Sequence, residues 1–198
     1  MAPSAKAETR RAEIIDAARA LFSRKGFEET SLEDIGREAA MGKASIYYYF
    51  PDGKESIFAA AVQVEIGTLF QALTENLANA HTPLEQLRLY LHQRVLLFHD
   101  QALRYGMVEE VRQELMSRAE RELQGHFEAE LVLLEHLLSE GIANTSLRNH
   151  DPRTGARILQ SALKGVTSDA PLPRDMETVE THAEMFVEMI LNGLTNGQ

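Results

Sequence analysis

The chain has 198 residues, of which 44% are apolar. This is enough to bury a core, either in one large domain or in a small domain joined to a larger one. It contains no cysteine, which excludes disulfides, thiolate catalysis and cysteine metal sites. Because Glu, Arg or Gln interrupts each apolar run, and residues 1–9 lack the apolar part of a signal peptide, we expect a cytoplasmic protein with no membrane partner.

The formal net charge of −10 is unevenly distributed. Residues 1–54 hold nine Lys and Arg against nine Asp and Glu, whereas residues 55–198 hold eleven against twenty-one. A neutral N-terminal part can still bind phosphates if its cations share one face, while the acidic remainder repels nucleic acid. The charge distribution is therefore compatible with moderate, salt-sensitive DNA binding by the N-terminal part.

The first predicted helix covers residues 7–25 and ends at Gly26, a residue typical of the position just after a helix. Before it, the small, polar residues 1–9 are typical of an untied terminus. Lys6, Arg10 and Arg11 could reach a DNA backbone or minor groove from there. The inward positions of this helix are Ile14, Ala18, Leu21 and Phe22.

Residues 31–50, SLEDIGREAAMGKASIYYYF, predict two short helices. Ser31 followed by Asp34 resembles a capping box, which opens the first helix. Residues 40–42 interrupt it, and a second helix starts at Lys43. Two short helices across such a turn predict a helix-turn-helix, whose second helix enters a DNA major groove. The inward positions are Leu32, Ile35, Ala39, Ile46 and Phe50.

The outward positions of the second short helix suit contacts with DNA. Ser45 and the hydroxyls of Tyr47, Tyr48 and Tyr49 can bond phosphate oxygens, and Lys43 can reach a phosphate or a guanine edge. The alternative is that the tyrosines are core aromatics. Three consecutive tyrosines cannot all face one core, because a helix turns by about 100° per residue.

The rest of the chain also has helical periodicity, and no strand pattern or internal repeat occurs. We therefore expect an all-α protein of about nine helices. A helix-turn-helix DNA-binding domain would cover residues 1–53, and a helical ligand-binding and dimerisation domain residues 54–198. The further helices are expected at residues 54–80, 83–105, 107–115 (a short segment), 116–140, 152–167 and 175–194.

Residues 11–58 resemble the DNA-binding domain of the TetR family of one-component transcriptional regulators. The sequence departs from the family pattern with Ala40 in place of a turn glycine, Gly42 in place of a Ser or Thr cap, and one extra residue before Lys54. The matching residues are 14–18, 21–22, 25–27, 30–32, 34–35 and 43–50.

The resemblance implies a repressor that binds double-stranded, near-palindromic operator DNA as a homodimer and responds to a small-molecule effector. By position-for-position match, Lys43, Ala44 and Tyr47 would face base edges. The residues expected at phosphates are Thr30, Ser31, Ser45, Tyr48, Tyr49 and Lys54.

The last two predicted helices each carry an apolar face. In the TetR family the equivalent helices pair with those of a second subunit, so the resemblance implies the same interface here. The alternative is that both faces pack within one chain. The expected interface residues are Leu159, Ala162, Leu163, Val166, Met185, Phe186, Met189 and Ile190.

The resemblance also implies an effector pocket within the helices of residues 83–167. The residues available there are mostly aliphatic or aromatic, which favours an apolar or aromatic effector. The alternative for each residue is an ordinary core position. The candidate pocket residues are Tyr90, Val95, Phe98, Tyr105, Met107, Val108, Met116, Phe127 and Leu131.

The histidines raise the possibility of a metal or catalytic site. His92 and His99 share a helix face, and His126 lies four residues from both Glu122 and Glu130. No HExxH, GxSxG, Walker or dinucleotide-binding motif occurs, so we expect no metal, no cofactor and no enzyme activity. Two alternatives to a regulator are a helical carrier protein without specific DNA binding and an enzyme in the helical body.

Overall fold

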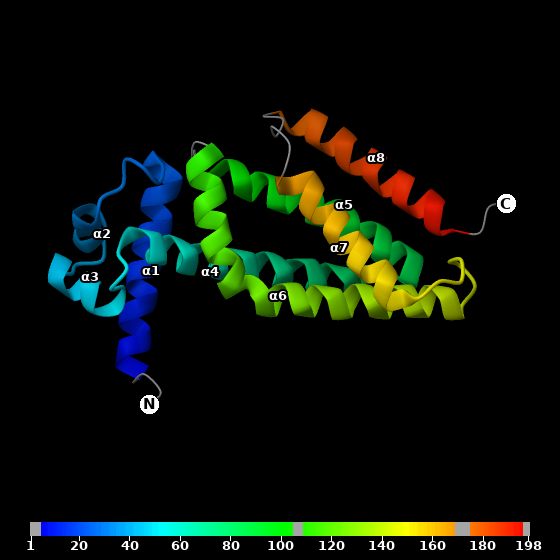
Figure 1. Cartoon of the computed structure of the whole chain (residues 1–198), viewed down its shortest axis with the longest axis horizontal. Coiled ribbons are helices and arrows are strands. Elements are labelled where there is room, and N and C mark those ends of the chain that lie inside the picture. Colours follow the sequence, from blue (N-terminus) through cyan, green and yellow to red (C-terminus); the bar gives the residue numbers. More distant parts are fainter. Residues whose placement is uncertain (1–4, 105–108, 169–174, 196–198) are drawn as a thin grey trace. The chain divides into compact units, whose positions relative to one another are not determined.

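The computed structural model describes residues 5–104, 109–168 and 175–195, without the side chains of 98, 100–104, 109–122, 167 and 168 (Figure 1). The regular secondary structure of these residues is helical, apart from an isolated antiparallel bridge between Leu147 and Thr195, which confirms the all-α prediction. The helices are α1 (Ala5–Lys25), α2 (Leu32–Glu38), α3 (Lys43–Tyr49), α4 (Lys54–Asn76), a 3-10 helix (Leu77–Asn79), α5 (Pro83–Arg104), α6 (Glu109–Ala143), α7 (Pro152–Ser168) and α8 (Met176–Leu194).

The chain divides into two compact units. The first unit comprises residues 1–67 and 104–124, and the second comprises residues 68–103 and 125–198. Helix α4 is continuous from Lys54 to Asn76 and contributes to both units. The predicted functional division between residues 53 and 54 stays a prediction.

Helix α6 differs from the sequence-based expectation. A separate short segment was predicted at residues 107–115, but α6 begins at Glu109 and continues without a break to Ala143. No proline or glycine occurs between Glu109 and Gln124, so nothing in this stretch interrupts the helical hydrogen bonds. The described residues therefore form eight α-helices rather than nine.

The expectation that no apolar run approaches a membrane span was wrong in one place. By length and composition, residues Lys54–Asn79 could cross a membrane. Half of the apolar window is buried inside the protein, and Ile57, Phe58 and Leu73 have no exposed side-chain surface. A helix whose apolar surface packs within the fold is a core helix, and this packing accounts for the composition of α4.

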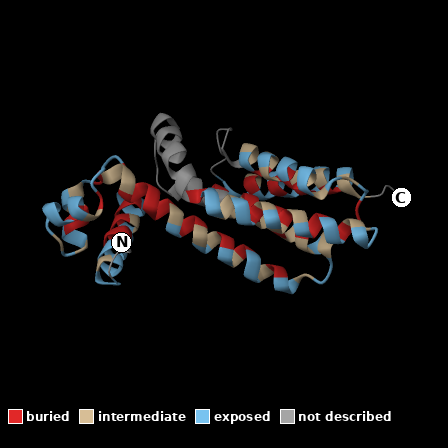
Figure 2. Cartoon of the chain, turned by 60° about the horizontal axis from the view of Figure 1, so that its bottom comes forward, coloured by how far each residue is buried: buried red, intermediate tan, exposed pale blue. Residues whose placement is uncertain are grey.

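Figure 2 shows buried residues on the helices of the first unit, and an aromatic cluster lies among them. The ring centroids of Phe22 and Phe27 lie 5.5 Å apart, and Phe58 lies 5.7 Å from Phe22 and 5.3 Å from Phe27. The tilted and edge-to-face arrangements are the favourable ones for aromatic rings. The cluster joins the end of α1, the turn that follows it and the first turns of α4.

Helices α2 and α3 are joined by a tight turn. Ser31 and Asp34 form the predicted capping box at the start of α2. After α2, Ala40 adopts a φ of 51°, a left-handed conformation that favours glycine. This confirms that the turn tolerates a Cβ where the TetR family usually has glycine. Gly42 then caps α3 without a side-chain hydrogen bond.

Gly36 lets the turn fold back onto α2. Its carbonyl accepts a hydrogen bond from the Met41 amide at 2.7 Å, and a Cβ at position 36 would lie only 2.7 Å from the Met41 carbonyl oxygen. Only a residue without a Cβ permits this approach, because a backbone atom cannot move aside as a flexible side chain can. The angle between α2 and α3 therefore depends on Gly36.

We predict that Gly36→Ala destabilises the protein by about 1–3 kcal/mol, because the added methyl group overpacks the α2–α3 turn. The matched control is Gly125→Ala, another helical glycine, where an added Cβ meets nothing within 4 Å. The control should stabilise the protein by about 0.5–1 kcal/mol through helix propensity. Urea denaturation measures both changes, and a stabilising Gly36→Ala would contradict the close packing.

We also predict that Asp34→Asn lowers the melting temperature at pH 7. Lys25 Nζ donates to the Asp34 carboxylate at 2.7 Å, and Ser31 Oγ and N donate at 2.7 and 3.1 Å. The bond from Lys25, followed by those from Ser31, lowers the pKa of Asp34 far below its usual range.

A carboxylate whose pKa is lowered by folding stabilises the fold above its unfolded pKa of about 3.9, and this contribution is lost as the pH falls below that value. The difference in melting temperature between wild type and Asp34→Asn should therefore shrink steadily between about pH 4 and pH 2. A difference that stays constant over this range would show that the ionised carboxylate is not the stabilising species.

Candidate nucleic-acid interface

Helix α3 turns one side inward and the other to solvent. Ile46 has no exposed surface and Phe50, which caps the helix, is 2% exposed. On the other side Tyr47 is 45% and Tyr48 77% exposed, whereas Tyr49 is half-buried. The alternative that all three tyrosines are core aromatics is therefore wrong for Tyr47 and Tyr48. The other exposed residues of α3 are Lys43, Ala44 and Ser45.

Aromatic contacts position the C-terminal end of α3. The rings of Tyr48 and Tyr49 meet edge to face at 5.0 Å, and the Arg11 guanidinium lies 4.7 Å above the Phe50 ring. The cation–π contact holds the charge of Arg11 near the end of α3. Arg11 thus lies beside the candidate DNA-binding helix, and its contact with DNA stays a prediction.

Thr30 and Ser31 are both predicted phosphate ligands, but the structure places them differently. Ser31 is exposed at the N-cap of α2, where a phosphate could approach the helix N-terminus. Thr30 is 1% exposed, and its hydroxyl donates to the Gly26 carbonyl at 2.7 Å. Its contact with phosphate stays a prediction that would require the hydroxyl to leave this internal bond.

Lys54 is also engaged within the protein. Its ammonium donates to the carbonyls of Phe27 at 2.8 Å and Glu28 at 3.3 Å, and it lies 4.2 Å from the centroid of the Phe27 ring. Partial burial lowers the pKa of Lys54. The predicted phosphate contact is untested, and it would compete with these carbonyls. The sequence around Lys54 could not have predicted these internal hydrogen bonds, because the two carbonyl acceptors lie 26 and 27 residues away in sequence.

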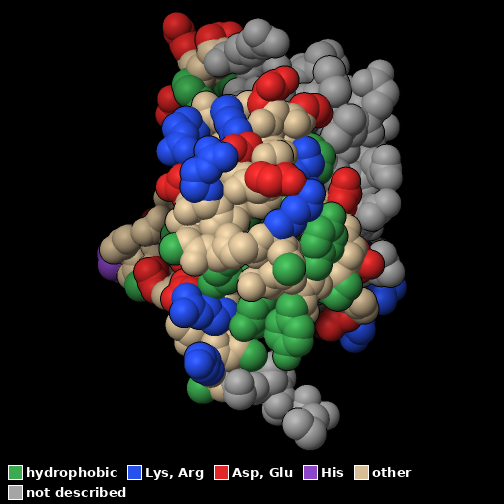
Figure 3. Space-filling view, turned by 90° about the vertical axis from the view of Figure 1, so that its left-hand side faces the viewer, with side chains coloured by type: hydrophobic (Ala, Val, Ile, Leu, Met, Phe, Trp, Pro, Cys, Tyr) green, Lys and Arg blue, Asp and Glu red, His purple; other side chains and the backbone are tan. Residues whose placement is uncertain are grey.

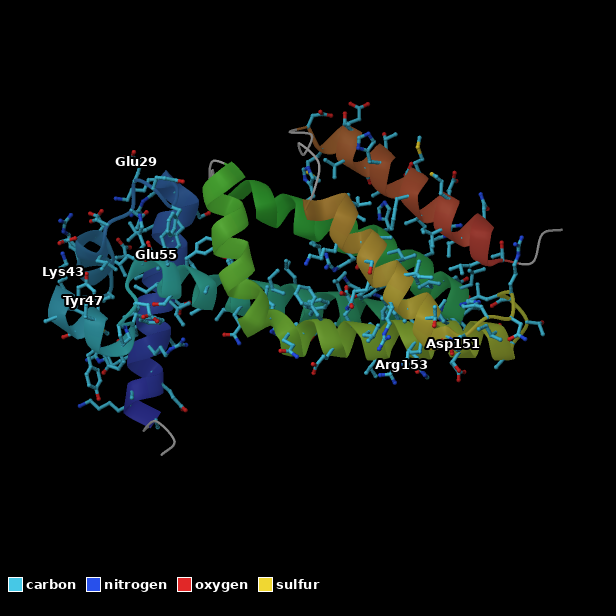
Figure 4. The ribbon with its side chains drawn as sticks, in the orientation of Figure 1. Glu29, Lys43, Tyr47, Glu55, Asp151 and Arg153 are labelled. Atoms are coloured by element: carbon cyan, nitrogen blue, oxygen red, sulfur yellow. The ribbon has the colours of Figure 1, made fainter. Side chains whose placement is uncertain are left out.

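Lys43 forms an ion pair across the turn. Its ammonium contacts the carboxylate of Glu33 in the first turn of α2. This bond raises the pKa of Lys43 and lowers that of Glu33. In Figure 4 the side chains of Lys43 and Tyr47 lie together at α3, away from Glu29. Sequence reasoning identified Lys43 but missed its partner.

The surface around α2 and α3 is not a uniform basic patch. Figure 3 shows Lys and Arg side chains interspersed with Asp, Glu and hydrophobic ones. Several cations pair with α2, as Lys25 does with Asp34 and Arg24 with Glu38 at 3.6 Å. Because each of these cations is balanced by a nearby acid, the N-terminal residues have no net charge and still carry individual cations at the candidate interface.

The predicted effector pocket can be located only in part. Tyr90 and Val95 of α5 are buried, and Phe127 and Leu131 of α6 are half-buried. The other predicted pocket residues lie outside the described residues or side chains. They are Phe98, Tyr105, Met107, Val108 and Met116.

A buried polar network lies beside Tyr90, and sequence reasoning did not predict it. Glu130 Oε1 accepts hydrogen bonds from the Tyr90 hydroxyl and from Arg94 Nε, both at 2.8 Å, and Glu130 Oε2 accepts from Gln160 at 3.1 Å. Burial, together with the adjacent Glu130 carboxylate, raises the pKa of Tyr90. A carboxylate with three donors is well satisfied in a core, so the network ties α5, α6 and α7 together.

Two aromatic contacts extend this part of the second unit. Phe70 of α4 stacks on His126 at 5.7 Å and meets Phe127 edge to face at 6.5 Å. His99 of α5 is 3% exposed, and neither of its ring nitrogens has a hydrogen-bond partner among the described residues. A buried imidazole without partners is costly, which makes His99 a candidate for contact with a ligand.

An open groove of about 700 Å³ lies between the first half of α5 and α8. It was not predicted from the sequence. Its lining mixes polar and apolar surface and includes two histidines together with acidic and basic groups. The lining residues are Asn79, Ala80, His81, Glu85, Arg88, Leu89, His92, Glu184, Val187 and Glu188. In the part of the chain that can be described, no three His, Asp or Glu side chains are grouped to hold a metal ion.

The predicted dimer faces separate into buried and exposed residues. Leu159 and Leu163 of α7 are buried within the single chain, and Ala162 and Val166 are half-buried. The burial of the two leucines agrees with the alternative that this face packs within one chain. On α8, Met185 is 56% and Met189 71% exposed, with Phe186 and Ile190 half-buried. Ile158 of α7, 61% exposed, was missed. The apolar surface open to a partner is thus mainly on α8.

Comparisons with known proteins agree with this architecture. The model for "Bacterial regulatory proteins, tetR family" matches residues 14–61. The biofilm operon negative transcriptional regulator IcaR of Staphylococcus aureus is 28% identical over 130 residues, 66% of each chain. The fatty acid metabolism regulator protein of Bacillus subtilis is 23% identical over 189 residues, 93% of this chain and 95% of the relative.

Solved structures show the same fold along the whole chain. A TetR-family transcriptional regulator from Pectobacterium atrosepticum aligns with a TM-score of 0.75 at 19% identity and covers 99% of both chains. A TetR/AcrR-family regulator from Thermobifida fusca aligns at 0.66 with 26% identity, over 93% of this chain and 98% of the other. These relatives are transcriptional regulators and not enzymes. The family-model match, the curated relatives and the solved structures all support a transcriptional regulator of the TetR family.

Proposed function

We propose that this regulator is a homodimeric repressor that binds a near-palindromic operator and leaves it when a small, largely apolar effector binds. The observation that carries the proposal is the exposed side of α3, where Lys43, Ala44 and Tyr47 face solvent at the position of a TetR-family recognition helix. A domain at residues 1–53 would bind DNA, and residues 54–198 would bind the effector and the second subunit in the cytoplasm.

In this proposal α3 enters the major groove. Lys43 reaches a guanine edge or a phosphate, the small Ala44 permits close approach, and the Tyr47 ring contacts base edges. Phosphate contacts from Ser31, Ser45, Tyr48 and Tyr49 fix the position of the helix, with Thr30 and Lys54 contributing if they leave their internal bonds.

Dimerisation follows from the length of DNA that one helix-turn-helix can recognise. A single recognition helix contacts only a few base pairs, so useful affinity needs two copies on neighbouring half-sites. The exposed stripe of Met185 and Met189, flanked by Phe186 and Ile190, supplies an apolar surface for the second subunit. Ile158 and the half-buried Ala162 and Val166 of α7 would border it, while Leu159 and Leu163 would support it from within the protomer.

The effector would bind inside the second unit near Tyr90, Val95, Phe127 and Leu131. An apolar molecule suits these side chains, and His99 would supply one hydrogen bond to a polar group on it. The name of the Bacillus relative, a fatty acid metabolism regulator, is consistent with an apolar effector. Because α4 contributes to both units, a shift of α4 could change the separation of the two recognition helices. The effector acts only if it binds the released state more tightly.

We predict that Tyr47→Ala lowers the affinity for the operator by about 1–3 kcal/mol and leaves binding to scrambled DNA nearly unchanged, because Tyr47 contacts bases. The matched variant Tyr48→Ala should weaken binding to both DNAs alike, since Tyr48 contacts phosphates. Fluorescence anisotropy with the intergenic DNA beside the protein's own gene, at two salt concentrations, measures both effects.

Two outcomes of this experiment would contradict the proposal. Equal binding of the wild type to the intergenic and scrambled DNA would leave only a nonspecific cationic surface. No binding to either, with no small molecule found by mass spectrometry of the denatured protein, would favour the helical carrier protein instead.

We further predict that Met189→Glu converts the dimer into monomers, because a charge would be buried in the centre of the proposed interface. The matched control is Val132→Glu on α6, since Val132 is 67% exposed but lies outside the proposed interface. Sedimentation velocity distinguishes the two states. A Met189→Glu protein that stays dimeric would place the interface elsewhere.

A further inference from the structure

The recognition helix begins with a lysine that is already paired with a carboxylate. Lys43 is the first residue of α3, and its ammonium contacts Glu33, ten residues earlier in the first turn of α2. The side chains remain 49% and 55% exposed. The ion pair therefore lies on the surface beside Tyr47, where DNA would approach.

The other acids of α2 have different partners. Asp34 is bonded by Lys25 and Ser31, and Glu38 pairs with Arg24. Among the described residues, Glu33 is the carboxylate that pairs with Lys43, and no second cation pairs with Glu33. The bond between them is also the first cause of the lowered pKa of Glu33. The pair is thus a self-contained contact rather than part of a larger network.

This arrangement places a carboxylate and a DNA phosphate in competition for one ammonium group. An exposed ion pair contributes little free energy, and so does one phosphate contact in salt. The free energies of the Lys43–Glu33 contact and of a Lys43–phosphate contact are therefore comparable, and exchanging one for the other stabilises the complex only slightly. When Lys43 does leave, Glu33 stays behind as an unpaired negative charge close to the phosphates.

We propose that Glu33 competes with DNA for Lys43 and limits the affinity of each recognition helix for DNA of any sequence. This inference rests on the proposed contact between α3 and DNA. Its consequence is that each subunit binds about two- to fivefold more weakly than it would without Glu33, which adds to the need for both subunits of a dimer. Release by an effector then needs a smaller change in geometry, because each half-site interaction is weak.

The test compares Glu33→Gln with Glu29→Gln. Both remove one negative charge from an exposed residue of the first unit, but Glu29 lies apart from Lys43 (Figure 4). In anisotropy titrations with a short random-sequence duplex at low salt, Glu33→Gln should raise the affinity about two- to fivefold above the control, the range of an exposed ion pair. The slope of log affinity against log salt should steepen by at most about 0.9, the value for one fully added phosphate contact.

The same substitution in a Lys43→Met background identifies the cause. There the gain from Glu33→Gln should be clearly smaller than in the presence of Lys43, because no ammonium is left to release and only the repulsion by Glu33 is removed. A gain that is undiminished without Lys43, or equal gains from Glu33→Gln and Glu29→Gln in the presence of Lys43, would overturn the inference and leave general charge repulsion as the cause.

A measurement without DNA separates this inference from the proposed function. In an NMR titration of the free protein, the pKa of Glu33 should lie below its ordinary value and return to it in Lys43→Met. If it does not, the ion pair is absent in solution and the inference fails, even when the wild type binds its operator. If the ion pair is present but the wild type binds no duplex, the proposed DNA binding is wrong. The proposed competition between Glu33 and DNA is then wrong as well.

Discussion

The aromatic contact between Phe22, Phe27 and Phe58 organises the first unit. It brings the end of α1 and the start of α4 together and leaves the carbonyls of the intervening turn pointing at Lys54. The end of α1 also carries Lys25, which binds Asp34 of the α2 capping box. The position of α2, and through the Gly36 turn that of α3, thus depends on a cluster of buried rings that would never touch DNA.

Several cations near the recognition helix are already bound by groups of the protein itself. Lys25, Lys43 and Lys54 have a carboxylate or carbonyl partner, and Arg11 lies over an aromatic ring. Such a surface attracts DNA less strongly than a bare basic patch would. In the proposed dimer, specific contacts from two subunits would then matter more than general charge attraction, as the proposed release by a small effector requires.

The second unit combines an apolar interior with a polar network. The Glu130 carboxylate joins Tyr90, Arg94 and Gln160, and the loss of Arg94 would leave the buried charge of Glu130 unpaired. This network would hold α5, α6 and α7 in fixed relation around the proposed effector site. A ligand there would therefore act on a rigid set of helices, and rigid elements transmit a displacement better than loose ones do.

The sequence alone determined the features that depend on neighbouring residues. The spacing of Ile14, Ala18 and Leu21, the Ser31–Asp34 capping box and the alternation of Ile46 and Phe50 with exposed tyrosines are all local, because helical contacts join residues three or four apart. These patterns were enough for the all-α fold and for the helix-turn-helix, and the motifs of residues 11–58 carried the resemblance to the TetR family. They also left Tyr47 and Tyr48 correctly at the surface.

Tertiary structure decided what local spacing cannot encode. Leu163 and Met189 are both apolar positions on amphipathic helices, yet one is buried and the other exposed, because burial depends on which helix packs against each face. Glu33 pairs with Lys43, and Glu130 with Arg94, across ten and thirty-six residues. Sequence shows the charges but not which of them meet, since pairing over such separations is set only when the chain folds back on itself.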